Sequence, residues 1–575
     1  MAYEKMFFIF FTKTMITIFF FFLCCFGVSD GARGISLEGS KGKWQFLLKS
    51  TGVVSMHMAL TYKNTVIMFD QTGGGPSRYP LRKRFGSGSR CTRSVKDLMD
   101  ATCYAHSVEY HIKSNSVRPL RLDTDPWCSS GSFLSDGTLL GTGGGYGKGG
   151  KRIRFYSPCG KNHQCDWNQS KNYLSDERWY ASTQTLSNDR AIIVGGRKVF
   201  TYEFVPKMSN GEKSYNLPFL QQTYDKSAKG NNLYPFIHLS SDGNLFIFAN
   251  RDSILLNPRL NKVIKTFPRI PGDGSRNYPS SGSSVMLPLD HRDNFQKVEV
   301  MVCGGSATGA VRNAAKGRFI EGLRSCGRMV ITGNKHKWDM EYMPEPRLVH
   351  NMLILPTSHI LFINGAKLGC AGYENARNAS LEPFLYNPYK RLGTRFQILK
   401  STNIPRMYHS SAILLPDGRV LVGGGNPHGR YLFHNVSYPT ELRLQAFIPY
   451  YMKKRFNSFR PSNLTIESHG GGKSLGIVYG REFVVRFMVG KFASKNNELK
   501  FSAYAPPFTT HSLSMNERML KLRCKRMVQK ISGGWVTAVL EAPPSPHVAP
   551  AGYYLLTIVN GAIPSKSEWI QFRNA

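Results

Sequence analysis

The chain has 575 residues, of which 41% are hydrophobic and 12% aromatic, and this composition excludes an intrinsically disordered protein. It has 75 basic and 37 acidic residues, which give a formal net charge of +38. This charge favours an acidic polysaccharide or a membrane surface as partner. The alternative is a solvated basic surface without a specific partner. No RNA- or DNA-binding motif accompanies this charge, so we expect no nucleic-acid partner, and 55 glycines with 31 prolines favour an all-β fold rich in turns.

The N-terminal 30 residues have the pattern of a secretory signal peptide. Lys5 and Lys13 precede an apolar run from about Met15 to Val28, and small residues follow it. An uncleaved membrane anchor is the alternative, but the run is short for a membrane span. We therefore expect residues 1–30 to be removed, with cleavage near residues 27–32, and the mature protein to be extracellular without a stable membrane span.

Potential glycosylation sites agree with export from the cell. Asn-x-Ser/Thr sequons, which are modified only in the secretory pathway, occur at Asn168, Asn378, Asn435 and Asn463. We expect these four asparagines to be candidates for N-glycosylation.

The cysteine count is the second feature that bears on export. Of eleven cysteines, Cys24 and Cys25 leave with the signal peptide, and the remaining odd number means that at least one thiol is outside the intramolecular disulfides. Cys159 and Cys165 are close enough to form a disulfide, and the other pair considered is Cys91 with Cys103. The spacing alone does not fix the connectivity.

One sequence pattern recurs along the chain: a short apolar strand, a polar turn, a second apolar strand and often a glycine pair. Copies begin near residues 53, 133, 185, 238, 285, 353 and 413. Strand–turn–strand units at a period of roughly 50 to 65 residues are typical of kelch-type β-propeller blades. We therefore predict a seven-bladed kelch-type propeller over residues 35–455.

After Tyr450 this pattern ends, and the sequence predicts alternating strands without the polar turn and glycine pair of the repeat. Short alternating strands over about 120 residues are typical of an immunoglobulin-like β-sandwich. We predict such a sandwich, as a separate C-terminal domain, over residues 456–575.

Alignment of the repeats on their turns brings chemically active residues to one position. Cys128, Tyr180 and His409 each stand nine residues before a turn, and Tyr408 precedes the last of them. Equivalent positions of successive blades lie in one ring around a propeller axis, so these side chains can meet there. The same offset selects Tyr234, and a similar one selects His350. Any one of these residues could be ordinary packing, or together they could bind a metal. No HExxH or CxxC pattern supports zinc.

The motifs around these positions resemble a known family. They are "DTDPWCSSGSFLSDGTLLGTGG", "RWYASTQTL", "NNLYPFIHL", "RNYPSSGSSVMLPLD", "IPRMYHSSAILLPDGRVLVGGGNPH" and "YAPPFTTHSLSMNERM". In sequence and in order they are similar to the glyoxal oxidases, secreted copper-radical aldehyde oxidases related to galactose oxidase, and most of all to the plant members. The resemblance extends from about Gly39 to the C-terminus.

The resemblance implies a role for each residue of the site. Cys128 would be joined by a thioether to the ring of Tyr180, which would bind copper and carry a radical. Tyr408 would be the axial copper ligand and the base, and His409 an equatorial ligand. His511, on a C-terminal-domain loop that reaches into the propeller, would be the second histidine ligand. The implied reaction converts a small aldehyde such as glyoxal or methylglyoxal to the acid and reduces O2 to H2O2, outside the cell and in the cell wall.

One segment departs from galactose oxidase, in which a tryptophan stacks on the cross-linked tyrosine. Here Gly195 and Gly196 are followed by Arg197 and Lys198, so the covering aromatic must come from elsewhere. Trp127 and Phe200 are the candidates. The difference favours aldehyde oxidation over galactose oxidation.

The second functional hypothesis is a catalytically silent propeller that binds acidic cell-wall polysaccharide through its basic surface. A pure binding module has no need of a copper pocket. The set of Cys128, Tyr180, Tyr408, His409 and His511 therefore favours the enzyme.

Overall fold

The computed structural model describes residues 40–81, 104–145, 147–159, 165–467, 476–493, 498–529 and 534–575. The predicted signal peptide lies outside these ranges, and so does the considered pair of Cys91 and Cys103. Within the described ranges no helix has both the length and the apolar character needed to cross a membrane. The helices in these ranges are short: α2 (Pro218–Gln222), α3 (Ala310–Ala314) and the 3-10 turns Thr72–Gly74, Gly147–Lys151, Lys226–Ala228, His291–Asp293, Tyr450–Met452 and Lys454–Phe459.

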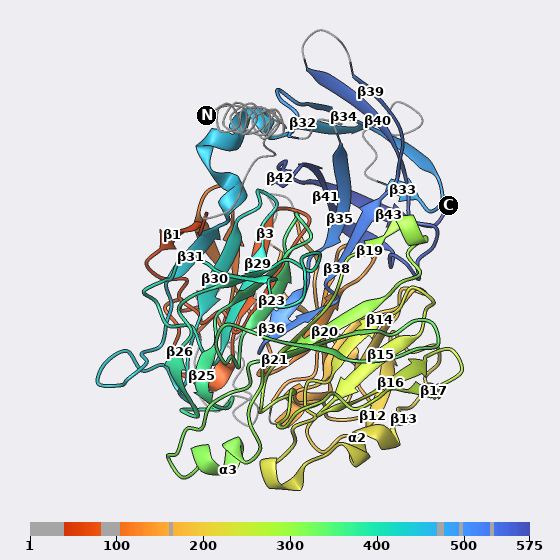
Figure 1. Cartoon of the computed structure of the whole chain (residues 1–575). Coiled ribbons are helices and arrows are strands. Elements are labelled where there is room, and N and C mark those ends of the chain that lie inside the picture. Colours follow the sequence, from red (N-terminus) through yellow and green to blue (C-terminus); the bar gives the residue numbers. More distant parts are fainter. Residues whose placement is uncertain are drawn as a thin grey trace, which may run out of the picture.

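Small antiparallel sheets follow one another along the first three quarters of the chain (Figure 1). In order they are β2-β3-β4-β5 (His57–Leu60, Thr65–Phe69, Ser107–His111, Ser116–Leu120); β6-β7-β8-β9 (Ser130–Phe133, Leu139–Thr142, Arg152–Tyr156, Asn168–Tyr173); β10-β11-β12-β13 (Ser182–Thr185, Ala191–Val194, Thr201–Val205, Tyr215–Asn216); β14-β15-β16-β17 (Phe236–Leu239, Leu245–Ala249, Asp252–Asn257, Lys262–Thr266); β18-β20-β21-β22 (Ser283–Met286, Glu299–Cys303, Ser325–Val330, Asp339–Tyr342); and β23-β24-β27-β28 (Asn351–Ile354, Ile360–Ile363, Phe384–Tyr386, Phe396–Ile398). A separate hairpin joins β25 (Ala366–Gly369) to β26 (Ala376–Ala379). Each predicted strand–turn–strand repeat is an antiparallel pair of strands, so the prediction of these units is confirmed.

The last sheet of this region is completed by the first described strand of the chain. Its order is β1-β31-β30-β29, with β1 at Lys43–Leu48, β29 at Ser410–Leu414, β30 at Val420–Gly424 and β31 at Leu444–Ile448. Pairing of β1 with β31 joins the two ends of the region and covers a strand edge that would otherwise be exposed.

Burial within each sheet falls from the first strand to the last. β10, β14, β18, β23 and β29 are buried along their whole length, whereas β9 and β17 are largely exposed and β28 is only partly buried. The second strands carry continuous apolar runs, such as Ala191–Val194 and Leu245–Ala249, because neighbouring sheets cover both of their faces. The first strands of neighbouring sheets also contact one another, as β6 contacts β10 and β23 contacts β29, so the first strands lie innermost.

A buried arginine supports the chain at the entry to several of these sheets. Each of these guanidinium groups donates a hydrogen bond to a backbone carbonyl at the end of the second strand of its sheet: Arg178 to Gly195, Arg276 to Gly304, Arg347 to Asn364 and Arg406 to Gly424. Because a buried charge is costly without partners, these bonds fix the segment that leads into the innermost strand.

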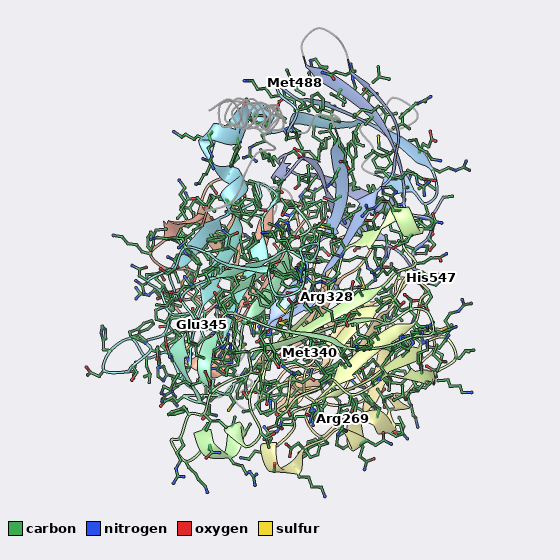
Figure 2. The ribbon with its side chains drawn as sticks, in the orientation of Figure 1. Arg269, Arg328, Met340, Glu345, Met488 and His547 are labelled. Carbon is green, nitrogen blue, oxygen red and sulfur yellow. A yellow bond between two sulfur atoms is a disulfide. The ribbon has the colours of Figure 1, made fainter. Side chains whose placement is uncertain are left out.

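Substitution of Arg178 by methionine is expected to lower the free energy of unfolding by about 3–5 kcal/mol, the cost of breaking a buried ion pair. Arg178 is fully buried and its Nε lies 2.7 Å from Glu203 Oε1, so the variant leaves this buried carboxylate with only the more distant Lys207, at 4.0 Å. Urea unfolding measures the loss. The control is Arg269→Met, because Arg269 is 62% exposed on the outside of the molecule (Figure 2) and its pair with Asp252 contributes at most about 1 kcal/mol. Equal losses in the two variants would contradict this role of Arg178.

Polar side chains also tie neighbouring sheets together. Arg328 of β21, labelled in Figure 2, forms an ion pair with Glu299 at 2.8 Å and donates a hydrogen bond to the hydroxyl of Tyr386 in β27 at 2.9 Å. The Tyr386 hydroxyl in turn donates to Glu341 at 2.6 Å. The network satisfies the charge of Arg328 at the boundary between two sheets.

Two disulfides occur within the described residues. The Cys159–Cys165 pair is confirmed, with Cα atoms 5.8 Å apart. The second, Cys303–Cys326, crosses from β20 to β21 and was not predicted, since its partners are 23 residues apart. Cys128, Cys370 and Cys524 are free thiols.

The C-terminal region consists of two further sheets at one end of the molecule (Figure 1). One has the order β32-β34-β40-β39 (Ser462–Glu467, Glu482–Met488, Trp535–Glu541, Cys524–Gln529). The other has the order β19-β38-β35-β41-β43-β33 (Leu289–Asp290, Arg518–Leu522, Leu499–Ala505, Gly552–Asn560, Glu568–Arg573, Gly476–Val478), with β42 (Ile563–Pro564) paired to β41. Buried Val485, Phe487, Ala503 and Ile558 belong to the core between them, as expected for a sandwich.

One hairpin of this region extends into the other sheets. β36 (Phe508–Thr510) pairs with β37 (Leu513–Met515) and also with β2, where Thr510 stands opposite His57. The hairpin therefore carries residues of the C-terminal region to the innermost strands.

Candidate active site

The predicted site residues of the repeats lie at the entry to the innermost strands, in an uncommon backbone conformation. Their φ values are positive: 54° for Cys128, 65° for Tyr180, 50° for Tyr234 and 61° for His409. Residues other than glycine rarely adopt positive φ, and such positions concentrate at functional sites. The shared conformation supports the alignment of these residues as equivalent positions.

His511 reaches the same place from the C-terminal region. His511 and Ser512 form the two-residue tip of the β36–β37 hairpin, with φ of 45° and 79°, which are the signs required by a type I′ turn. The tip is anchored because Ser283 Oγ donates to the Ser512 carbonyl at 2.6 Å. A histidine at this turn position is unusual, since asparagine and glycine are favoured there.

Hydrogen bonds connect the strand entries to each other. The Tyr180 amide donates to the Cys128 carbonyl at 3.1 Å, and the Tyr234 amide donates to the Tyr180 carbonyl at 2.8 Å. Next in the series, Asn277 Nδ2 donates to the Tyr234 carbonyl at 3.0 Å. The positions of Cys128 and Tyr180 are therefore fixed relative to one another by the backbone.

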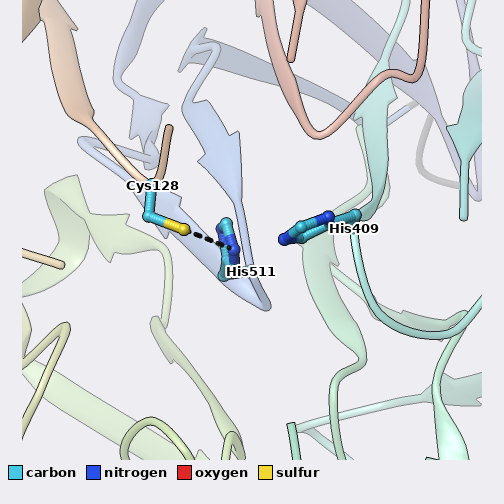
Figure 3. A group of neighbouring side chains, drawn as sticks. All are labelled: Cys128, His409 and His511. Atoms are coloured by element: carbon cyan, nitrogen blue, oxygen red, sulfur yellow. Dashed lines mark hydrogen bonds between the residues drawn. The ribbon is translucent and has the colours of Figure 1, made fainter. Parts of the chain in front are cut away.

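The side chains of Cys128, His409 and His511 converge on one point (Figure 3). Their ligand atoms lie within 4.8 Å of one another, and Cys128 Sγ is 3.3 Å from His511 Nε2. Both ring nitrogens of His409 are buried without a hydrogen-bond partner. An unpartnered buried imidazole beside a second imidazole has the character of a metal ligand.

Two phenols complete the cluster. The Tyr408 ring stacks on His409 with centroids 4.0 Å apart and lies 5.5 Å from His511. The Tyr180 ring lies 6.0 Å from His511. The structure thus brings together all five residues that were predicted for the site. Imidazole and phenolate donors suit cupric copper, so the residues present fit that ion.

Burial keeps the cluster uncharged in the absence of a cation. It lowers the pKa of His409 and of His511 well below the ordinary value, so both imidazoles are neutral and able to bind a metal. Burial likewise raises the pKa of Tyr180 and of Tyr408 well above the ordinary value. A divalent cation reverses this preference, since it stabilises the phenolate.

The aromatic cover of Tyr180 comes from two residues that sequence reasoning missed. Tyr278 stacks on Tyr180 with centroids 4.3 Å apart and planes at 23°, and Trp179 does so at 4.8 Å and 29°. The two candidates lie further out: Trp127 packs on Trp179, and Phe200 on Tyr224. The sequence does contain a pattern that could have identified Tyr278. Residues 276–278 repeat the Arg-x-Tyr pattern of residues 178–180 and 406–408.

The remaining candidates differ in their surroundings. Among the described residues, one cluster of side chains could hold a metal, and it consists of Cys128, His409 and His511. His350 is fully buried but does not belong to this cluster. The four sequon asparagines, Asn168, Asn378, Asn435 and Asn463, are all exposed.

Comparisons with known proteins agree with this geometry. The family model described as glyoxal oxidase N-terminus matches residues 56–451, and that of the galactose oxidase-like early set domain matches residues 460–572. Aldehyde oxidase GLOX of Vitis pseudoreticulata is 40% identical over 539 residues, which cover 93% of this chain and 98% of the relative. Aldehyde oxidase GLOX1 of Arabidopsis thaliana is 41% identical over 536 residues, which cover 92% and 84%.

A solved structure has the same fold. A fungal alcohol oxidase of the AA5 family, in complex with copper, superposes with a TM-score of 0.68 over 93% of this chain and 100% of its own, at 15% identity. The solved structure shows the same fold, and the second family model shows a galactose oxidase-like early set domain at residues 460–572. Since the first family model covers more than half of the sequence, the chain belongs to the glyoxal oxidase family.

Proposed function

We propose that this protein is a secreted copper-radical oxidase that converts small aldehydes such as glyoxal or methylglyoxal to carboxylic acids while O2 is reduced to H2O2. The observation that carries the proposal is the convergence of two imidazoles, two phenols and one free thiol at the innermost strands. The names of the relatives from Vitis pseudoreticulata and Arabidopsis thaliana, both aldehyde oxidases, support the substrate class.

Four side chains would hold the copper ion: Tyr180, Tyr408, His409 and His511. Bound copper would accept one of the two electrons that aldehyde oxidation releases. Tyr180 would hold the other oxidising equivalent as a radical, because a thioether to Cys128 makes its phenol easier to oxidise. The free, buried state of the Cys128 thiol and the backbone hydrogen bond between the two residues support this cross-link.

The residues of the chain would act on the hydrated aldehyde, a gem-diol. Tyr408 as phenolate would take the proton of one hydroxyl group, as a general base. Tyr180 as radical would take the hydrogen atom from carbon. These two steps remove two protons and one electron, and bound copper would accept the second electron. The substrate then becomes the acid, and O2 would accept the two electrons and two protons as H2O2.

The architecture that we propose assigns residues 35–455 to a seven-bladed kelch-type propeller and residues 456–575 to the sandwich domain. The succession of four-stranded sheets, completed by β1, supports the propeller. The sandwich domain would supply His511 through the β36–β37 hairpin, which explains why the two domains occur in one chain.

We further propose that the protein is a glycoprotein of the extracellular space and the cell wall, exported by residues 1–30. Disulfides persist in oxidising compartments, and the exposed sequon asparagines are accessible to glycosylation. A fall in mass after enzymatic removal of N-linked glycans from secreted material tests this. The net charge of +38 supports acidic cell-wall polysaccharide as an additional partner.

The test of the function uses the mature protein loaded with copper. Glyoxal or methylglyoxal is expected to yield one H2O2 per O2 consumed, and a chelator is expected to abolish turnover until copper, but not zinc, is restored. Zinc fails because it has no redox chemistry. Copper-loaded protein that binds acidic polysaccharide but makes no peroxide would instead support the catalytically silent propeller.

A further inference from the structure

A third tyrosine, Tyr278, lies between the two phenols of the site. Its hydroxyl is 3.1 Å from the hydroxyl of Tyr180 and 2.8 Å from that of Tyr408. Its ring also stacks on Tyr180 at 4.3 Å. Tyr278 therefore contacts the proposed radical residue in two ways and the proposed base in one.

The backbone around Tyr278 is held rigidly. The Tyr278 amide donates to the Leu233 carbonyl at 3.1 Å. Arg276, two residues earlier, is fully buried and donates to the carbonyls of Gly304 and Ser325 at 2.8 and 3.0 Å. Since the segment is fixed on both sides of Asn277, the phenol is a built part of the site and not a mobile side chain at its rim.

The neighbouring aromatics cannot replace it. Tyr234 also contacts Tyr180, edge to face at 5.4 Å, but its hydroxyl donates to the Ser129 carbonyl at 3.0 Å. Trp179 stacks on Tyr180, but an indole carries only a donor and cannot accept from either phenol. Of these three aromatics, Tyr278 alone joins Tyr180 to Tyr408.

We propose that Tyr278 is a positioning residue with two separable effects, an inference that rests on the proposed function. Its hydroxyl holds the oxygens of Tyr180 and Tyr408 in the arrangement that lets one substrate molecule give a proton to Tyr408 and a hydrogen atom to Tyr180. Such prior alignment is a large source of rate enhancement. Its ring covers Tyr180 and excludes water and small reductants from the radical.

Two substitutions separate the effects. Tyr278→Phe keeps the stacked ring and removes both hydrogen bonds, whereas Tyr278→Leu removes the aromatic cover as well. The control is Tyr202→Phe, because Tyr202 is a buried tyrosine of β12 whose hydroxyl also donates one hydrogen bond, to Asn261 at 3.1 Å, away from the site. All variants are prepared as the full mature chain with copper.

Five quantities are measured in each: copper per chain, the Cys128–Tyr180 cross-link by peptide mapping, the half-life of the tyrosyl radical by its optical and paramagnetic spectra, and kcat and KM for glyoxal. Tyr278→Phe is expected to keep copper, cross-link and radical half-life. It is expected to lower kcat roughly tenfold, with KM within about twofold, because its two hydrogen bonds to the phenols are lost. Tyr278→Leu is expected to shorten the radical half-life in addition, by roughly tenfold or more.

A parental kcat in Tyr278→Phe, or a parental radical half-life in Tyr278→Leu, overturns the inference. A loss of kcat in Tyr278→Phe that is comparable to the loss in Tyr202→Phe also overturns the inference, because it indicates a purely structural role for Tyr278. A parent protein that forms neither cross-link nor radical refutes the proposed function instead, and this is read from the parent before any variant is compared.

Discussion

Tyr180→Phe is expected to lose peroxide production from glyoxal by at least about a thousandfold, because residues that act as one catalytic unit fail together when one is removed. The variant keeps the ring that packs against Tyr278 and Trp179, so the fold is retained, but it has no oxygen to bind copper or to carry the radical. Peroxide release measures the effect. A Tyr180→Phe enzyme that still turns over would rule out the proposed radical.

Cys128→Ser gives the matched control for the cross-link. It keeps the phenol of Tyr180 and the backbone hydrogen bond between the two residues, and removes only the sulfur. The expected loss of turnover is of similar size, about a thousandfold. Peptide mapping of the copper-treated parent should recover residues 128 and 180 in one linked fragment whose mass is lower by two hydrogen atoms. Separate fragments would contradict the thioether.

The second large effect is expected in metal binding. His409→Ala should lower copper affinity by at least about a hundredfold, since loss of groups that merely orient a ligand already costs 10- to 100-fold. His409 is buried and neither of its ring nitrogens has a hydrogen-bond partner, so a ring nitrogen is available to bind the metal. Copper titration with measurement of bound metal per chain gives the affinity.

His350→Ala is the matched control for this prediction. His350 is as buried as His409, and its ring nitrogens also lack hydrogen-bond partners, yet it does not belong to the metal cluster. It should therefore retain one copper per chain even if it is less stable. Equal loss of copper from both variants would attribute the effect to unfolding, and parental copper in His409→Ala would remove this histidine from the ligand set.

Features that depend on residues close together in the chain could be predicted from the sequence. The repeated hairpins follow from alternating apolar residues and turn residues within a few positions of each other. The Cys159–Cys165 disulfide likewise joins residues six apart. The Cys303–Cys326 disulfide escaped prediction because its pairing depends on the register of β20 against β21.

The site residues also divide into those that could be predicted from nearby sequence and those that could not. The repeat alignment selected Cys128, Tyr180 and His409, because equivalent positions in successive hairpins share one backbone conformation. His511 is 383 residues from the Cys128 sulfur that it contacts, and only the resemblance to the family pointed to it. Tyr278 carries the same Arg-x-Tyr signal as Tyr180 and Tyr408, but its two hydroxyl contacts cannot be read from that signal.

The sequence by itself determined the hairpins, the change of pattern after Tyr450 and the chemical types of the site residues. Only the tertiary structure decided that β1 completes the last sheet, that the β36–β37 hairpin carries His511 to β2, and that Tyr278 joins the two phenols. The reason is physical: hydrophobic periodicity and turn chemistry act between near neighbours in the chain, whereas these contacts depend on how distant segments pack.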